Sequence, residues 1–142
     1  MGERDLTSIS VRKEWKDIRS SGLPESIDIE LYRAIAGSTE LPQYVGHETI
    51  VPDSSSNWSM TFENLPKNDT NGNTFIYTVK ERPIEGYVAT VTGDQDNGYV
   101  ITNSIPRTPP TADYFHVWSL IVVLSISLVT LMTLGLQRIG KE

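Results

Sequence analysis

The chain has 142 residues, enough for about one domain, and a formal net charge of −6. It contains no cysteine, so neither a disulfide framework nor a thiolate metal site can form. Residues 1–113 carry 10 basic and 17 acidic side chains, and an acidic domain repels phosphate backbones. We therefore do not expect nucleic acid among its partners.

Residues 8–104 follow a short linker, 1–7, and form a series of short strand candidates separated by turns. Apolar and polar residues alternate along most of these segments, which is typical of strands with one buried face. The expected strands are 9–15, 26–33, 49–51, 58–62, 75–81, 87–91 and 99–103. Residues 34–47 are weakly patterned, and we interpret them as a loop that could include a short edge strand.

About seven short strands in roughly one hundred residues predict an all-β fold, an Ig-like (prealbumin-like) β-sandwich. No helical periodicity is found before residue 114. The expected organisation is a linker at 1–7, the sandwich at 8–104, a proline-rich spacer at 105–113, a transmembrane helix at 114–137 and a cytoplasmic tail at 138–142.

Three polar residues interrupt the apolar faces of these strands. Lys13, Glu81 and Asn103 each fall in register with the apolar residues of their own strand. A buried ammonium without a partner is too costly to keep, so Lys13 either meets an acid inside the sandwich or loses its proton. The three residue types could react together if the strands bring them into contact.

The reaction would join Lys13 to Asn103. Burial favours the neutral amine, which is a nucleophile, and a protonated Glu81 could polarise the carboxamide of Asn103. Attack of the amine on that carbon, with Glu81 moving the proton, releases ammonia and leaves an isopeptide bond. It happens once per molecule, so we do not classify the chain as an enzyme. The alternative is a buried Lys13–Glu81 ion pair with Asn103 as a hydrogen-bonded neighbour.

Four segments carry a resemblance to a known family. They are Val-Arg-Lys-Glu-Trp at 11–15, Asn-Trp-Ser-Met-Thr-Phe-Glu-Asn-Leu-Pro at 57–66, Tyr-Thr-Val-Lys-Glu at 77–81 with Gly-Tyr at 86–87, and Gly-Tyr-Val-Ile-Thr-Asn at 98–103. Over residues 9–103 the chain resembles the Cna B-type (SpaA-type) domains of Gram-positive surface adhesins and pilins. The resemblance implies that Lys13 and Asn103 are the cross-linked pair and Glu81 the catalytic acid.

The C-terminal part predicts attachment to a membrane. Residues 117–136 contain no charged side chain, which is about the length of a helix that crosses the hydrocarbon core. Aromatic residues precede this span, and Arg138 and Lys141 follow it, so the C-terminus is expected in the cytoplasm and the acidic domain outside. A buried core helix is the alternative. Residues 1–10 lack the apolar core of a secretory signal, so we expect the C-terminal end of a longer surface protein, or a misplaced start codon.

The order of spacer, apolar span and basic tail resembles a degenerate LPxTG-like sorting signal. The candidate motif is Thr108, Pro109, Pro110, Thr111 and Ala112. Thr108 stands where the family has leucine and Ala112 where it has glycine. Two outcomes are therefore open: a sortase cleaves after Thr111, or the helix stays as a permanent anchor.

These features predict a structural module, the stalk or base of a cell-wall adhesin or pilus. Expected partners are the membrane and, in addition, sortase, peptidoglycan or other pilins. The main alternative is a host-ligand-binding adhesin domain that uses the loop 34–47; a tail-anchored cytoplasmic protein is a further one. No cofactor or metal is expected: Asp69, Asn71 and Asn73 resemble the start of a calcium loop, but the required glycine and glutamate are absent.

Overall fold

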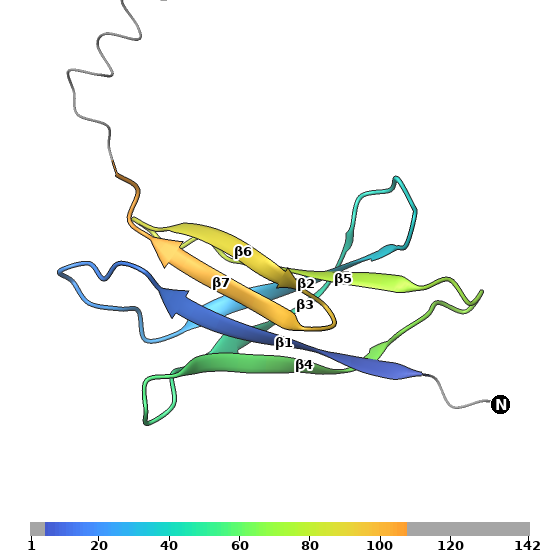
Figure 1. Ribbon diagram of the computed structural model, residues 1–142, viewed down its shortest axis with the longest axis horizontal. Coiled ribbons are helices and arrows are strands. Elements are labelled where there is room, and N and C mark those ends of the chain that lie inside the picture. The colour runs from blue at the N-terminus through green and yellow to red at the C-terminus, as the bar shows by residue number, and fades with distance from the viewer. Residues whose placement is uncertain (1–4, 108–142) are drawn as a thin grey trace, which may run out of the picture. The chain divides into compact units, whose positions relative to one another are not determined.

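The computed structural model describes residues 5–107, and this part of the chain forms seven strands (Figure 1). They are β1 (Leu6–Trp15), β2 (Ile27–Ile35), β3 (Gln43–Ile50), β4 (Trp58–Pro66), β5 (Phe75–Glu81), β6 (Val88–Asp94) and β7 (Gly98–Ser104). The predicted all-β sandwich of about seven strands is confirmed.

Two sheets form the sandwich. One has four strands in the order β4-β1-β7-β6, and the other has three in the order β3-β2-β5. All neighbours are antiparallel except β1 and β7, which run parallel at the centre of the larger sheet. In Figure 1 the arrowheads of β1, in blue, and β7, in orange, point the same way. The first and last strands of the domain are therefore direct neighbours.

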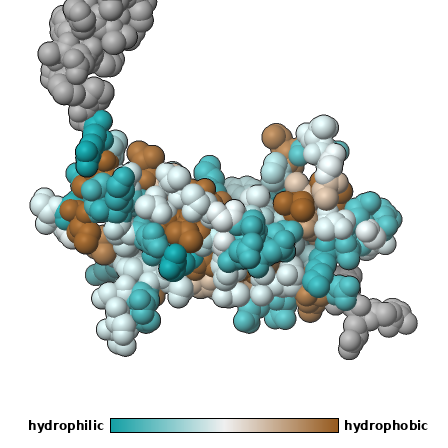
Figure 2. All heavy atoms as spheres, in the orientation of Figure 1, coloured by the Kyte–Doolittle hydropathy of each residue, from teal (hydrophilic) through white to brown (hydrophobic). Residues whose placement is uncertain are grey.

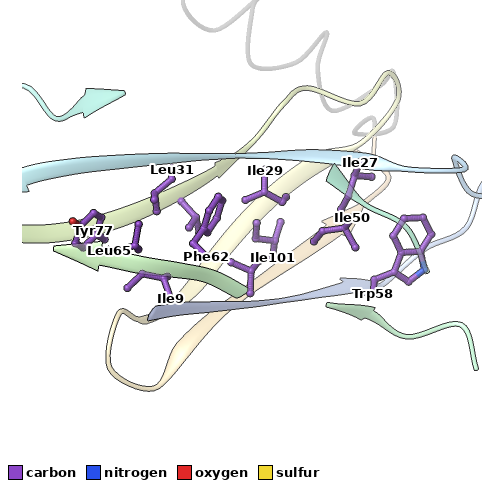
Figure 3. Close-up of a cluster of buried hydrophobic side chains, with 12 residues drawn as sticks. Ile9, Ile27, Ile29, Leu31, Ile50, Trp58, Phe62, Leu65, Tyr77 and Ile101 are labelled. Carbon is purple, nitrogen blue, oxygen red and sulfur yellow. The ribbon is translucent and has the colours of Figure 1, made fainter. Parts of the chain in front are cut away.

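The core lies between the two sheets because alternate residues of each strand point inward. In β2, Ile27, Ile29 and Leu31 are buried, and the residues between them are half exposed. Figure 3 shows these side chains meeting Ile9 and Ile101 from the opposite sheet. Burying one such aliphatic side chain contributes about 1.5–3 kcal/mol relative to leaving it exposed. The outer surface in view is mostly hydrophilic (Figure 2).

Several boundaries differ from the sequence-based expectation. β4 and β6 extend to Pro66 and Asp94, beyond the expected ends at 62 and 91, and β1 and β3 differ as well. β1 begins at Leu6, inside the predicted linker, because Leu6 and Thr7 already pair with the end of β4. β3 covers Gln43–Ile50, where a loop that could include a short edge strand, and then a three-residue strand, were expected. β3 is an edge strand whose side chains are mostly exposed, so it lacks the alternation that identifies a half-buried strand.

The calcium-like segment is a hydrogen-bonded loop. The Asp69 carboxylate accepts the backbone N–H groups of Asn71 and Asn73 (both 2.8 Å) and the side-chain amide of Asn73 (2.9 Å). These bonds hold the pKa of Asp69 below its usual value. The side chain is thus committed to its own loop, and residues 5–107 contain no cluster of three or more metal-ligating groups.

The loop between β3 and β4 repeats this arrangement. The Asp53 carboxylate accepts the N–H groups of Ser55 and Asn57 (2.8 and 2.9 Å) and the side-chain amide of Asn57 (3.1 Å). The fourth residue of each loop, Ser56 or Gly72, has a positive φ. We call these two loops, residues 53–57 and 69–73, the Asp–Asn clips; the first precedes β4 and the second follows it.

The predicted sorting motif (108–112) and transmembrane helix (114–137) lie outside the described residues. Among residues 5–107, no helix has the length and apolarity needed to cross a membrane.

Candidate functional site

Lys13, Glu81 and Asn103 come from three different strands, and the fold brings all three together. In the parallel β1–β7 ladder, Lys13 is opposite Ile101 and Trp15 is opposite Asn103, so Lys13 and Asn103 are diagonal neighbours. Because they are an even number of positions apart, they share the inner face of this sheet. Glu81 is the last residue of β5 in the facing sheet. The site therefore lies between the sheets, among apolar residues.

Glu81 contacts both of the other side chains, and all three are almost completely buried. Lys13 and Glu81 are 4% and 5% exposed, and Asn103 is 0% exposed. The Nζ of Lys13 lies 3.0 Å from Oε2 of Glu81. The side-chain amide of Asn103 donates a hydrogen bond to Oε1 of Glu81 (2.6 Å). Glu81 thus touches both of its predicted partners at once, one with each carboxylate oxygen.

Burial works against the charged form of Lys13. It lowers the pKa of the ammonium, and the neighbouring Glu81 carboxylate raises it in part. The face of the Trp15 ring also favours the ammonium, because Nζ lies 4.3 Å from the ring centroid. Burial of Lys13 therefore opposes the charged state that Glu81 and Trp15 favour.

Several buried polar atoms of the site lack hydrogen-bond partners. Apart from the ion pair that joins them, Lys13 Nζ and Glu81 Oε2 have no hydrogen-bond partner among the described residues, and neither does the buried Asn103 Oδ1. Nitrogen and oxygen of an asparagine amide are assigned from their neighbours. A half turn of the Asn103 amide would present its oxygen, instead of its nitrogen, to Glu81 without moving any other heavy atom.

Aromatic rings cover this end of the core. Trp15 makes edge-to-face contacts with Trp58 and Tyr87, at centroid distances of 5.5 and 5.1 Å. Such pairs add about 0.5–1.5 kcal/mol to the stability gained by burying the rings. Trp15 in turn lies against the buried Lys13, and burial of this kind strengthens the electrostatic interactions within the site.

The strand β7 is fixed beside β1 beyond the site itself. The N–H of Lys16 donates to the carbonyl oxygen of Asn103 (2.8 Å), and the N–H of Ile105 donates to the carboxylate of Asp17 (3.0 Å). Both bonds join the chain after β1 to the chain around the end of β7. They fix the backbone of Asn103 relative to Lys13.

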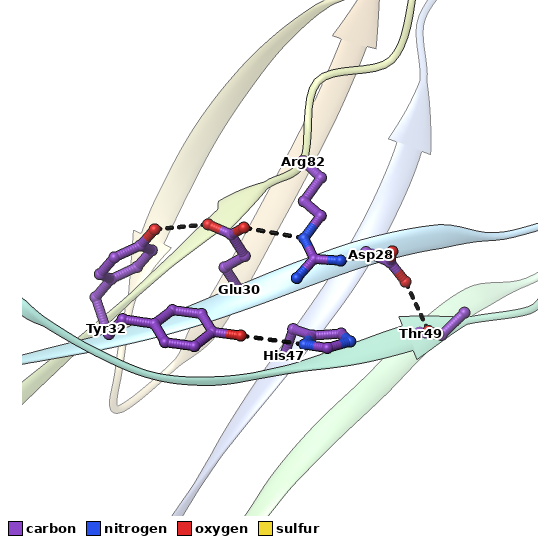
Figure 4. A network of polar contacts seen from close by, with 7 residues as sticks. Asp28, Glu30, Tyr32, His47, Thr49 and Arg82 are labelled. Carbon is purple, nitrogen blue, oxygen red and sulfur yellow. Dashed lines mark hydrogen bonds and ion pairs between the residues drawn. The ribbon is translucent and has the colours of Figure 1, made fainter.

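A second polar network, on the outer face of the smaller sheet, was not identified from the sequence (Figure 4). The guanidinium of Arg82 donates to Glu30 through Nε (3.0 Å) and to Asp28 through Nη1 (3.2 Å). Arg82 directly follows Glu81, so this network adjoins the buried site. Alternation predicts that Asp28 and Glu30 face outward, but only the register of β2 against β5 shows that Arg82 reaches them.

The comparisons with known proteins agree with the seven-stranded β-sandwich. Residues 9–104 match the model of the Cna protein B-type domain. The chain therefore belongs to the Cna B-type domain family. A search of curated proteins found no match.

Three solved structures illustrate the likeness. The single B repeat unit (B1) of the collagen binding surface protein of Staphylococcus aureus is 29% identical with a TM-score of 0.55, covering 72% of this chain and 51% of that one. The two-repeat unit (B1B2) of the same protein is 27% identical with a TM-score of 0.56, covering 71% of this chain and 26% of that one. The pilus adhesin SpaC from Lactobacillus rhamnosus GG shares the fold, at 23% identity and a TM-score of 0.53, with coverages of 72% and 12%. The match covers less than two thirds of each of these chains.

Removing one member of the buried pair should be costly. We expect Glu81→Leu to lower the free energy of unfolding by about 3–5 kcal/mol, because it leaves Lys13 without a counter-charge. The double variant Lys13→Met/Glu81→Leu should recover most of this loss, since two apolar side chains then replace the pair. Urea denaturation in an Asn103→Ala background, which keeps covalent chemistry out of the comparison, measures both. Equal midpoints for the single and double variants would contradict this account.

Proposed function

We propose that this chain is a mechanical module of a surface protein, the stalk or base of a cell-wall adhesin or pilus, closed by an isopeptide bond between Lys13 and Asn103. One observation carries the proposal: a buried amine, carboxyl group and carboxamide meet between the first and last strands of the domain. The relatives support the setting, because they are a collagen binding surface protein and a pilus adhesin.

The bond forms by transamidation within one molecule. A proton first moves from Lys13 to Glu81, so that Glu81 can donate it to the carboxamide oxygen and make the carbon electrophilic. The amine Nζ then attacks Cγ of Asn103. Glu81 takes the proton that Nζ loses on attack and passes it to Nδ2. The carbonyl re-forms as its oxygen returns the first proton to Glu81, Nδ2 leaves as ammonia, and the bond between Nζ and Cγ remains. The atoms balance without a co-reactant. Because the reaction happens once per molecule, we class the chain as self-processing and not as an enzyme.

The fold supplies the rate of this reaction. Glu81 holds Lys13 and Asn103 on its two oxygens, so no encounter step is needed, and placement of reacting groups is worth about 7–11 kcal/mol of the barrier in well-oriented systems. Exclusion of water by the aromatic rings also favours the neutral amine, because it removes the solvent that stabilises the ammonium. Lys13, Glu81 and Asn103 are all needed, each for a different part of the chemistry.

The position of the bond suits resistance to tension. β1 and β7 are parallel neighbours, so a pull on the chain before β1 and after β7 loads them in shear. Backbone hydrogen bonds alone would carry that load. With Lys13 joined to Asn103, the force passes through a covalent link, and most of the domain lies outside its path.

The intact mass of the folded chain tests the bond. We expect the full-length protein to be one ammonia lighter than its sequence. Glu81→Gln and Lys13→Ala should fold but keep the full sequence mass, because one lacks the proton carrier and the other the nucleophile. By analogy with a disulfide that closes a loop of this size, losing the bond should cost about 4 kcal/mol of stability. A full sequence mass for the folded wild-type chain would reject the proposal.

The C-terminal part supplies the attachment to the cell surface. We propose that the helix 114–137 holds the chain in the membrane with the sandwich outside, until a sortase cleaves after Thr111 or as a permanent anchor. The uncharged span and the basic residues that follow it support this orientation.

Peptide mapping of the mature protein separates the two outcomes. Sorting predicts a C-terminal peptide that ends at Thr111, linked to wall or pilus. A permanent anchor predicts recovery of the peptide containing Arg138 and extraction by detergent. Protease added to intact cells should digest the sandwich in both cases. Digestion only after lysis would point instead to a cytoplasmic location.

A host ligand is the second candidate function, and exposed apolar residues favour it. In the segment 34–47, Leu41 is 89% exposed, and Tyr44 and Val45 are 52% and 39% exposed. If this segment binds, Leu41→Ser should weaken adhesion of the full chain to immobilised extracellular-matrix proteins about tenfold, or 1.4 kcal/mol. Val88→Ser is the matched control, because Val88 is 50% exposed on β6. Equal binding by the two variants would exclude the segment.

A further inference from the structure

We propose that Arg82 is a positioning residue that aligns the Glu81 carboxyl group with both of its partners through Asp28 and Glu30. The inference rests on the proposed bond between Lys13 and Asn103. It assigns a task to the outer network of Figure 4. Arg82 itself does not touch the reacting atoms; it acts through the backbone of Glu81.

The backbone gives the first argument. Glu81 is the last residue of β5, where a strand would be free to fray. The N–H of Arg82 donates to the carbonyl oxygen of Asp28 (2.9 Å), which extends the β2–β5 ladder one residue past Glu81. Pro83 follows at once, has no N–H and could not continue the ladder. The bond made by Arg82 is thus the last one that can hold this end of β5.

The side chain gives the second argument. Ile29 is opposite Glu81 in the register of β2 and β5, and Asp28 and Glu30 are the residues on either side of Ile29. Arg82 contacts both, at 3.2 and 3.0 Å. It therefore spans the backbone position that faces Glu81, and its planar guanidinium limits sliding of β5 along β2 in either direction.

The two acids are themselves held in place. The second oxygen of Glu30 accepts the hydroxyl of Tyr32 (2.6 Å), and the second oxygen of Asp28 accepts the hydroxyl of Thr49 (2.6 Å). The hydroxyls and Arg82 together hold the pKa of both acids below their usual values. Each carboxylate thus has one fixed partner besides Arg82, so the network is anchored in β2 and β3.

The geometry of the buried site explains why such support matters. Glu81 must reach Lys13 with one oxygen and Asn103 with the other, at 3.0 and 2.6 Å. A displacement of about 1 Å can cost roughly a hundredfold in the rate of a reaction between positioned groups. An exposed ion pair alone contributes little to stability. The network should therefore affect the rate of bond formation more than the stability of the fold.

The rate of ammonia loss on refolding tests the inference. Full-length chains, collected in urea while they still have the full sequence mass, are refolded by dilution and followed by mass spectrometry. We expect Arg82→Ala to slow the loss at least tenfold, and Arg82→Lys to be intermediate because it keeps the charge but not the fork. Arg12→Ala is the matched control: Arg12 precedes Lys13 as Arg82 follows Glu81, but its ion pair is with Glu14 of the same strand.

The same substitutions in a Lys13→Ala background separate rate from stability. There no bond can form, and we expect Arg82→Ala to lower the melting temperature only slightly. Circular dichroism verifies the fold of each variant. If Arg82→Ala does not fold, the double variant Asp28→Asn/Glu30→Gln, which keeps the shapes of both side chains, should show the slower reaction. A rate within twofold of wild type in a folded variant overturns the inference, whereas absence of ammonia loss in the wild type rejects the proposed bond itself.

Discussion

An ammonium group enclosed between two sheets is the constraint on which the rest of the structure depends. Lys13 is acceptable in the core only because Glu81 meets it there, and Glu81 reaches it only if β5 faces the pair β1 and β7. Asn103 completes the cluster from the neighbouring strand. An error of one residue in the register of any of these strands would turn its polar side chain to the outer face. The site and the strand register therefore specify each other.

Much of the fold and the central cluster could be predicted from the sequence, because the alternation of apolar and polar residues shows which side chains of a half-buried strand face the core. Lys13, Glu81 and Asn103 interrupt otherwise regular apolar alternation along their strands. β3 was predicted only in part, since an exposed edge strand has no inner face to reveal. The start of β1 was missed because pairing with β4, and not burial, holds Leu6 in the strand.

The contacts around the site could not be predicted in the same way. Arg82 meets Asp28 and Glu30 because β2 and β5 pair in one particular register, which no local pattern encodes. The contact of Trp15 with Tyr87 likewise joins segments that are far apart in the chain. Alternation shows which way a side chain points, but its neighbours depend on how the strands are ordered in the sheets.

The Asp–Asn clips have a consequence for resistance to proteolysis. They flank the edge strand β4, and exposed loop tips are the sites that proteases preferentially cut. A protease must draw several residues of a loop into an extended form before it can cut. Each clip ties its five residues together through an aspartate and an asparagine, so that opening it breaks several hydrogen bonds at once. The two loops that flank the exposed edge are thereby poor substrates for cleavage.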